Sequence, residues 1–444
     1  MGKLNREKRA AEARQRARDR GGRTWPWTTS DMADVDDDRR GEGKGDEASS
    51  HTLRSLARTA AQVLVHSGPL AARTFIDDLN SVCQTLGLRR AHLVLDQVLL
   101  EEVQRAWQRG WLPIDVFQFV RRRVGNEAAS LAVDVVAAEH ARHASATVHP
   151  RWQDQVVEIG ATVWWDLAEP LLSQWARRHD HDEMTALITA VAVLGELAFA
   201  LATMPSLPPP GSVRDAGQAC SGVDEKVLSR VRGLLAKAES TDYPDEAEAL
   251  SAKAQELMNR YALDRAAVES ETRATPAVAV RRIWLESPYL AEKAHLATAV
   301  ATANRCRSVL AEKPGYLTLI GDQFDLDTTE LLSTSLLVQA NREMLVAGKR
   351  TGQAKTRSFR HAFLISYGVR IGERLRAVTE LKDTESRELV PVFAARERAI
   401  DGTFGELFPQ LTPRRFTVRD ATGWAAGHAA ADRARLTLER DQLR

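Results

Sequence analysis

The chain has few cysteines, and their arrangement excludes two common structural frameworks. Cys83, Cys220 and Cys306 are the 3 cysteines in 444 residues. An odd number at such wide spacing provides neither a disulfide framework nor a Cys-x-x-Cys zinc pair. The basic N-terminal stretch is not followed by an apolar segment, so the pattern of a signal peptide is missing as well. We therefore predict a protein of the reducing cytoplasm.

Recognised catalytic patterns are also missing. Gly348-Lys349-Arg350-Thr351 resembles the end of a phosphate-binding loop, but it lacks the upstream glycine and the Ser or Thr directly after the lysine. No Gly-x-Ser-x-Gly elbow occurs, and no cysteine has a histidine at a catalytic spacing. The EHARH run with His140 and His143 is not a His-Glu-x-x-His motif. We predict no metal site and no cofactor, and whether the protein is an enzyme stays open.

Charge is nearly balanced overall but strongly divided at the N-terminus. The net charge of +1, with 44% hydrophobic and 27% charged residues, is typical of a globular protein and argues against a surface that binds nucleic acid everywhere. Residues 1–50 place an arginine-rich stretch before an acidic, glycine-containing one. This segment has too little apolar surface to offset the entropy of ordering, so we predict a disordered charged tail.

Residues 51–204 show helical periodicity almost throughout, with breaks at glycines and prolines such as Gly68-Pro69, Gly87 and Gly125. The tryptophans of this helical domain are expected to fill its core. Ala186 to Met204 is apolar enough to be tested as a membrane span, but Glu196 near its middle favours a buried helix. We predict no contact with a membrane. Residues 205–223, rich in proline and glycine, are expected to form a linker.

Residues 224–271 are expected to form a helical hairpin. Two apolar stripes at helical spacing, one including Leu234 and Leu235 and the other including Ala254 and Leu257, flank a polar turn at Ser240 to Pro244. The order of these residues in KVLSRVRGLLAKAESTDYPDEAEALSAKAQELMNRYALD resembles the bacterial domain-of-unknown-function family numbered 2786. The resemblance implies no catalytic role, and the downstream sequence resembles the region that accompanies this domain in actinobacterial proteins.

The remaining chain is predicted to be a small α+β domain over 275–383, followed by a C-terminal helical extension over 384–444. Strands are expected at Val278 to Glu286 and in CRSVLAE and GYLTLIG, and helices at Ala291 to Asn304, Leu326 to Val346 and Phe359 to Val378. In a final helix from about Asp420 to Leu438, a row of small residues indicates close helix packing. The predicted fold class is mainly α, with a small sheet covered by helices in the C-terminal half.

The strongest functional feature is a concentration of basic residues in the C-terminal half, which can neutralise phosphates. Its members are Lys349, Arg350, Lys355, Arg357, Arg360, Arg370, Arg374 and Arg376, opposed by only Glu373. Ordinary solvated side chains, or ion pairs within the fold, are the alternative reading of the same residues.

Three function classes remain open. The first is a nucleic-acid-associated protein that binds DNA or RNA through the basic residues. The second is a helical module that binds a protein partner. The third is an unrecognised metal-dependent hydrolase, for which Asp322, Asp325 and Asp327 after a strand are the candidate ligands, although helix capping by Asp325 or Asp327 explains them more simply. Nothing in the sequence indicates whether the protein forms oligomers.

Overall fold

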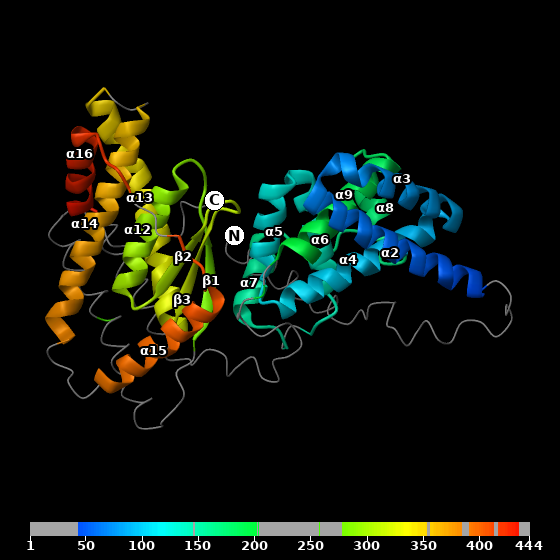
Figure 1. The fold of residues 1–444 in the computed structure, drawn as a ribbon, viewed down its shortest axis with the longest axis horizontal. Helices are drawn as coiled ribbons and strands as arrows, with labels where there is room; N and C mark the ends of the chain where they lie inside the picture. Colours follow the sequence, from blue (N-terminus) through cyan, green and yellow to red (C-terminus); the bar gives the residue numbers. More distant parts are fainter. Residues whose placement is uncertain are drawn as a thin grey trace, which may run out of the picture. The chain divides into compact units, whose positions relative to one another are not determined.

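The computed structural model describes residues 43–144, 147–201, 203, 257, 278–352, 356–383, 390–412 and 416–434. The chain divides into two compact units, Met1–Ala219 and Cys220–Arg444, and each is described here by itself (Figure 1). The expected linker over 205–223 and the expected hairpin over 224–271, apart from Leu257, lie outside the described residues.

The described part of the N-terminal unit is helical, as the sequence predicts. Its helices are α2 (Gly43–Ser67), α3 (Pro69–Leu86), α4 (Leu88–Gln108), α5 (Pro113–Arg123), α6 (Asn126–His140), α7 (Pro150–Glu158), α8 (Leu171–Arg178), α9 (Glu183–Gly195) and the π-helical turn η2 (Glu196–Ala200). Helix α2 begins inside the stretch 1–50 that was expected to be disordered. Its Leu53 and Ala57 are fully buried, and this packing stabilises the preceding helical turns.

The helix boundaries follow the expected breaks. Helices α3, α5 and α7 begin at Pro69, Pro113 and Pro150. A backbone N–H at the first position of a helix has no partner within the helix, so a proline, which lacks this N–H, costs no hydrogen bond there. Gly68 connects α2 to α3 with φ of 86°, a backbone conformation that glycine adopts without strain.

Most tryptophans described in this unit are buried in its core, as expected, whereas Trp164 is 36% exposed. Trp111, Trp152 and Trp175 are fully buried. Trp107 packs edge-to-face on Trp152 with ring centroids 4.8 Å apart, and Trp111 packs in the same way on Phe119 at 5.4 Å. Trp107 and Trp111 thus each have a different aromatic partner, since Trp107 lies in α4 and Trp111 follows the turn after the end of that helix.

The apolar segment with Glu196 lies among other helices of the unit. Among the described residues, Glu183–Ala200 is the one stretch long and apolar enough to cross a membrane, and 56% of it is buried inside the protein. Helix α9 contacts α2, α4 and α6. Glu196 accepts a hydrogen bond of 2.5 Å from Arg123 Nε, which compensates the buried carboxylate. These contacts are those of a core helix.

The C-terminal unit contains the predicted sheet. Strands β1 (Ala279–Trp284), β2 (Arg307–Ala311) and β3 (Tyr316–Gly321) are antiparallel in the order β1-β3-β2. Ile283 pairs with Leu317, and Leu317 with Leu310, so β3 is central. All its residues are buried, as expected for a strand with a neighbour on each side.

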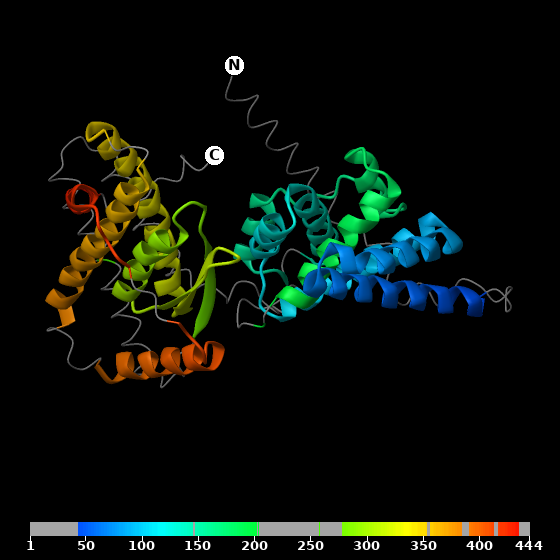
Figure 2. The ribbon, with the colours of Figure 1, turned by 45° about the horizontal axis from the view of Figure 1, so that its top comes forward.

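Helices cover this sheet, which confirms the predicted fold class. They are α12 (Leu290–Ala303), α13 (Gln323–Arg350), α14 (Arg357–Asp383), α15 (Val390–Leu407) and α16 (Ala421–Asp432). Helices α12 and α13 contact the strands, α14 packs on α12, and α16 packs along α14. Figure 2 shows the same elements from a second direction. Helix α15 contacts β2 and β3, where Arg307 donates a hydrogen bond of 2.6 Å to Asp401.

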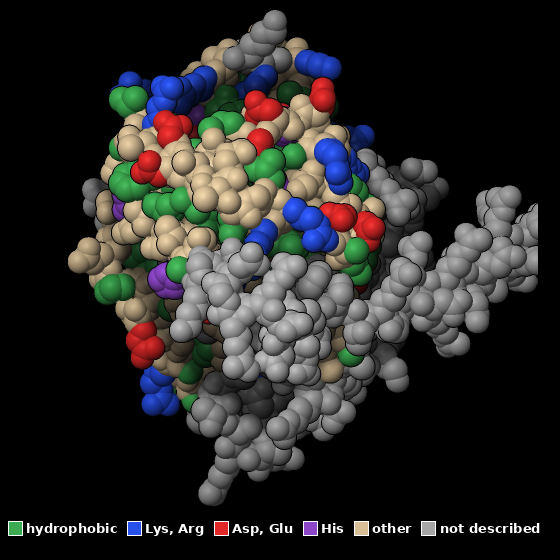
Figure 3. Space-filling view, turned by 90° about the vertical axis from the view of Figure 1, so that its right-hand side faces the viewer, with side chains coloured by type: hydrophobic (Ala, Val, Ile, Leu, Met, Phe, Trp, Pro, Cys, Tyr) green, Lys and Arg blue, Asp and Glu red, His purple; other side chains and the backbone are tan. Residues whose placement is uncertain are grey.

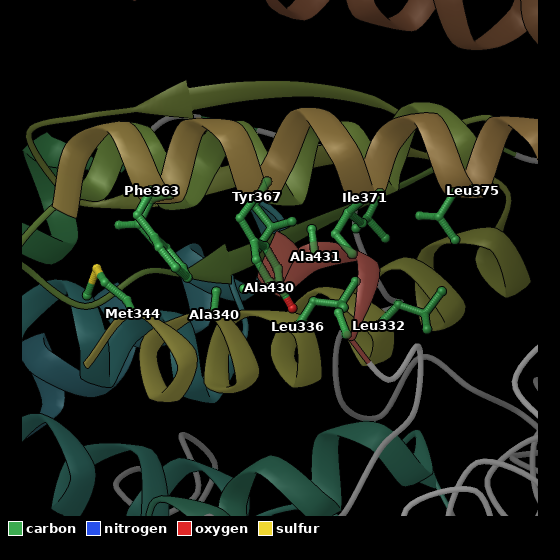
Figure 4. Close-up of a cluster of buried hydrophobic side chains, with 14 of the residues drawn as sticks. Leu332, Leu336, Ala340, Met344, Phe363, Tyr367, Ile371, Leu375, Ala430 and Ala431 are labelled. Carbon is green, nitrogen blue, oxygen red and sulfur yellow. The ribbon is translucent and has the colours of Figure 1, made fainter. Parts of the chain in front are cut away.

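The largest described core of this unit lies between α13, α14 and α16. Figure 4 shows Phe363, Tyr367 and Ile371 of α14 above Leu336 of α13. Leu257, the described residue of the expected hairpin, also packs against this cluster. The segment 224–271 therefore provides at least one apolar contact to the core.

Helix α16, which lies in the expected C-terminal extension over 384–444, is part of this core. A Cβ atom at Gly427 would lie 2.3 Å from the carbonyl oxygen of Phe363, and one at Gly423 would lie 2.5 Å from that of Phe359. Only glycine allows two backbones to approach so closely. The expected close packing is confirmed. The described helix ends at Asp432, and residues 435–444 lie outside the described part of the chain.

Candidate nucleic-acid interface

The turn between α13 and α14 carries half of the predicted basic residues. Helix α13 ends with Lys349 and Arg350, and α14 begins with Arg357. Gly352, with φ of 71°, follows the end of α13. Lys355 belongs to residues 353–355, which lie outside the described part of the chain.

Three described cations at this turn are available to solvent. Lys349, Arg350 and Arg357 are exposed, and none of them forms an ion pair with a described residue. No Asp or Glu occurs between Glu343 and Glu373 in the sequence. The stretch itself therefore adds only positive charge, while Asp420 from another segment accepts a hydrogen bond of 3.2 Å from the Ser358 hydroxyl at the start of α14. We define Lys349, Arg350 and Arg357 as the basic turn.

Arg370 and Arg374 have a different role, because their guanidinium groups bind within the fold. Arg370 donates a hydrogen bond of 2.6 Å to Asp432 and one of 2.9 Å to Glu373. The hydrogen bonds to these carboxylates raise the pKa of Arg370. Arg374 donates to the carbonyl oxygens of Ala431, at 2.5 Å, and Ala434, at 3.0 Å. It thereby satisfies carbonyls at the C-terminus of α16, where positive charge is favourable.

The predicted basic residues thus form two separate groups. Arg357 and Arg370 are thirteen residues apart on one helix, which at about 1.5 Å per residue separates them by roughly 20 Å. Arg376 also bonds within its own helix, from Nε to the Gly372 carbonyl oxygen at 3.2 Å. Arg360 is partly buried near the start of α14 and has contacts of its own. Among the described members of the predicted set, those of the basic turn are therefore the exposed ones without an ion pair to a described residue.

The three aspartates near the start of α13 are not brought together around a common point. Asp322 is the N-cap, and its carboxylate accepts a hydrogen bond of 3.0 Å from the Phe324 amide. Asp327 instead pairs with the buried Arg281 of β1 at 2.6 Å, and Asp325 is buried in the first turn. The sequence predicted capping by Asp325 or Asp327, but the capping residue is Asp322, and Asp327 forms an ion pair instead. Sequence reasoning missed Arg281, although the pair Arg281-Arg282 within the strand Ala279–Trp284 was an available signal.

One histidine of the EHARH run, His143, bonds to a buried carboxylate within the fold. The buried Glu139 accepts hydrogen bonds from the Trp107 indole, at 2.8 Å, and from His143, at 2.7 Å. Burial lowers the pKa of His140. Within the part of the chain that the structure describes, no group of three or more His, Cys, Asp or Glu residues is placed to hold a metal ion.

An exposed apolar stripe beside the basic turn was also missed from the sequence. Val338, Leu345 and Val346 of α13 are each more than 40% exposed. They recur at helical spacing opposite Leu336, Ala340 and Met344, which face the core. Figure 3 shows the side of the molecule that faces right in Figure 1, which belongs to the N-terminal unit; basic and acidic side chains are interspersed with hydrophobic ones there.

Comparison with known proteins adds one match. Residues 226–265 match the family described as Protein of unknown function (DUF2786). This agrees with the resemblance of the expected hairpin. No curated protein matches the chain. No solved structure matches it either. The match covers a short part of the chain and assigns no activity.

Proposed function

We propose that the C-terminal unit binds DNA or RNA through the basic turn, weakly and with little sequence preference. The observation that supports this proposal is the exposure of Lys349, Arg350 and Arg357 in a stretch without a single acidic residue. Cations that are already paired would lose those pairs on binding phosphate. These three have no described ion pair to lose.

The turn geometry suits a phosphate backbone rather than base edges. The three side chains come from two helix ends around a short turn, so they can follow a chain of phosphates without entering a groove. Contacts to phosphate and sugar fix position and carry no sequence information by themselves. Non-specific complexes of this type have dissociation constants of roughly 10⁻⁴ to 10⁻⁶ M at physiological salt.

Fluorescence anisotropy of labelled single-stranded and duplex DNA and of RNA, with the full chain at low salt, tests the proposal. We expect Lys349→Gln/Arg350→Gln/Arg357→Gln to weaken binding by about tenfold or more, since each phosphate contact contributes to affinity. The matched control is Arg73→Gln/Arg177→Gln/Arg419→Gln, which removes the same charge from scattered exposed positions. Equal binding by both variants, or no binding by the wild type, would refute the proposal.

Binding to a protein partner is the second candidate function. The exposed stripe of Val338, Leu345 and Val346 favours it, because apolar side chains gain little from contact with phosphates. Leu345→Gln/Val346→Gln distinguishes the two functions. If the protein binds nucleic acid through the basic turn, this variant keeps the wild-type affinity for nucleic acid. If it binds a protein partner through the stripe, the variant captures less of a partner whose binding survives nuclease treatment.

A further inference from the structure

A cleft in the N-terminal unit brings together opposite charges and apolar walls, far along the sequence from the basic turn. Its volume is about 350 Å³. This is close to the lower end of the roughly 300–1,000 Å³ typical of ligand sites, so a small molecule fits better than a dinucleotide. Helix α6, the loop after α7 and the end of α8 contribute most of the lining.

Asp134 provides a buried carboxylate in which one oxygen can accept a further hydrogen bond. The residue is only 7% exposed and lines the cleft. One oxygen, Oδ1, accepts a hydrogen bond of 2.9 Å from the Trp164 indole. Within the described residues, Oδ2 accepts none. Burial raises the pKa of Asp134 to about 6, against smaller opposing effects of the Trp164 hydrogen bond and the charge of Arg178. Ionised Asp134 therefore lacks full compensation within the fold.

Arg178 provides the opposite charge on the same cleft. Its guanidinium lies over the Trp164 ring, 4.3 Å from the centroid. It is close enough to Asp134 to lower that residue's pKa, yet the two form no direct ion pair. The side chain is exposed at the end of α8, so it can turn toward a ligand. The cleft thus presents an anion and a cation that do not neutralise each other by contact.

The neighbouring polar groups favour binding over nucleophilic catalysis. The Ser130 hydroxyl donates a hydrogen bond of 2.7 Å to the Glu127 carbonyl oxygen and accepts one of 2.9 Å from the Trp175 indole. Its proton is therefore engaged with a backbone acceptor, and His179 Nε2, 3.3 Å from the same oxygen, is not placed to remove it. Phe117, Val133 and Ile159 give the remaining wall an apolar character.

We propose that this cleft binds a small zwitterion of the α-amino-acid class with an apolar side chain. The ammonium group pairs with Asp134, and the carboxylate pairs with Arg178. The side chain lies against Val133, Ile159 and Phe117. One molecule whose ammonium and carboxylate groups are attached to the same carbon bridges two side chains that do not reach each other, and it gives each of the two charges a partner.

Isothermal titration calorimetry of the full chain with L-leucine tests this assignment. Two analogues, 3-methylbutylamine and 4-methylpentanoate, each keep the side chain and lose one charge. We expect L-leucine to bind and each analogue to bind at least about tenfold more weakly, the loss typical of one hydrogen bond between charged groups. No heat from L-leucine, or analogues that bind as tightly as L-leucine, would overturn the assignment.

Two variants identify the residues. Asp134→Asn keeps an acceptor for the Trp164 indole and removes the charge, and Arg178→Gln removes the opposite charge. Each is expected to weaken L-leucine binding by about tenfold or more, whereas the neighbouring exposed Arg177→Gln leaves it unchanged. Asp134→Asn should melt no lower than the wild type, because it removes a poorly compensated buried charge. Wild-type affinity in a folded Asp134→Asn or Arg178→Gln would contradict the proposal.

Discussion

Replacing Gly427 by alanine probes the closest helix contact in the C-terminal unit. An added Cβ would meet the Phe363 carbonyl oxygen at 2.3 Å and the Phe363 Cα at 2.9 Å. Ordinary contacts of a Cβ atom begin at 3.4 Å. Helices α14 and α16 would have to separate by about 1 Å, because the obstacle is backbone and cannot rotate away.

The expected cost follows from two opposing effects. Overpacking a well-packed core costs roughly 1–3 kcal/mol, and separating α16 also weakens the contacts of Ala430 and Ala431 with the core. Alanine favours the helix over glycine by about 1 kcal/mol. We expect a net destabilisation of about 1–2 kcal/mol. For a unit of this size that corresponds to a fall in Tm of roughly 2–8 °C.

Differential scanning calorimetry of the full chain, with a matched control, measures the effect. Gly405 lies in helix α15, and a Cβ there would meet nothing within 4 Å. Gly405→Ala should therefore raise the Tm of the same unit slightly, through helix propensity alone. If Gly427→Ala were as stable as Gly405→Ala, the helices would not be in backbone contact.

Two further expectations concern buried charges. Burial raises the pKa of Asp96 to about 7 although the amides of Leu171 and Leu172 donate to it. The folded state then binds this proton more tightly than the unfolded state. The stability contributed by Asp96 should fall by up to about 4 kcal/mol between roughly pH 4 and pH 7. In urea melts at pH 5 and pH 8, Asp96→Asn should not show this loss of stability with rising pH. Parallel pH profiles for the wild type and Asp96→Asn would contradict the expectation. The buried Arg281 pairs with Asp327 and Glu330 at 2.6 and 3.0 Å. Arg281→Met should cost about 3 kcal/mol in urea unfolding, while exposed Arg342→Met changes stability by less than about 0.5 kcal/mol. Equal costs would show that the pair is not buried.

Local sequence patterns predicted the helices and strands well, because the formation of these elements depends on residues that are neighbours in the chain. The expected strand GYLTLIG corresponds to Tyr316–Gly321, and the expected helix Ala291 to Asn304 corresponds to Leu290–Ala303. Alternation, helical periodicity and the positions of glycine and proline determine such segments. The row of small residues that includes Gly423 and Gly427 likewise predicted the close packing of this helix on a neighbouring one.

The candidate site was less predictable, because partners distant in sequence decide which charges are available. Nothing in the local sequence shows that Arg370 bonds to Asp432 or that Arg374 binds the carbonyl oxygens at the end of α16. The cleft with Asp134 and Arg178 depends in the same way on how α6 and α8 pack. A list of basic residues therefore predicts the charge of a region but not which side chains can reach a ligand.

The salt dependence of DNA binding tests the proposed function most directly. If Lys349, Arg350 and Arg357 each neutralise a phosphate of duplex DNA, the slope of log affinity against log salt contains about −0.9 from each contact. The variant with all three replaced by glutamine should then lose roughly 2–3 units of slope, while Arg73→Gln/Arg177→Gln/Arg419→Gln retains the wild-type slope. A basic-turn variant with the same slope and affinity as the wild type would contradict the account.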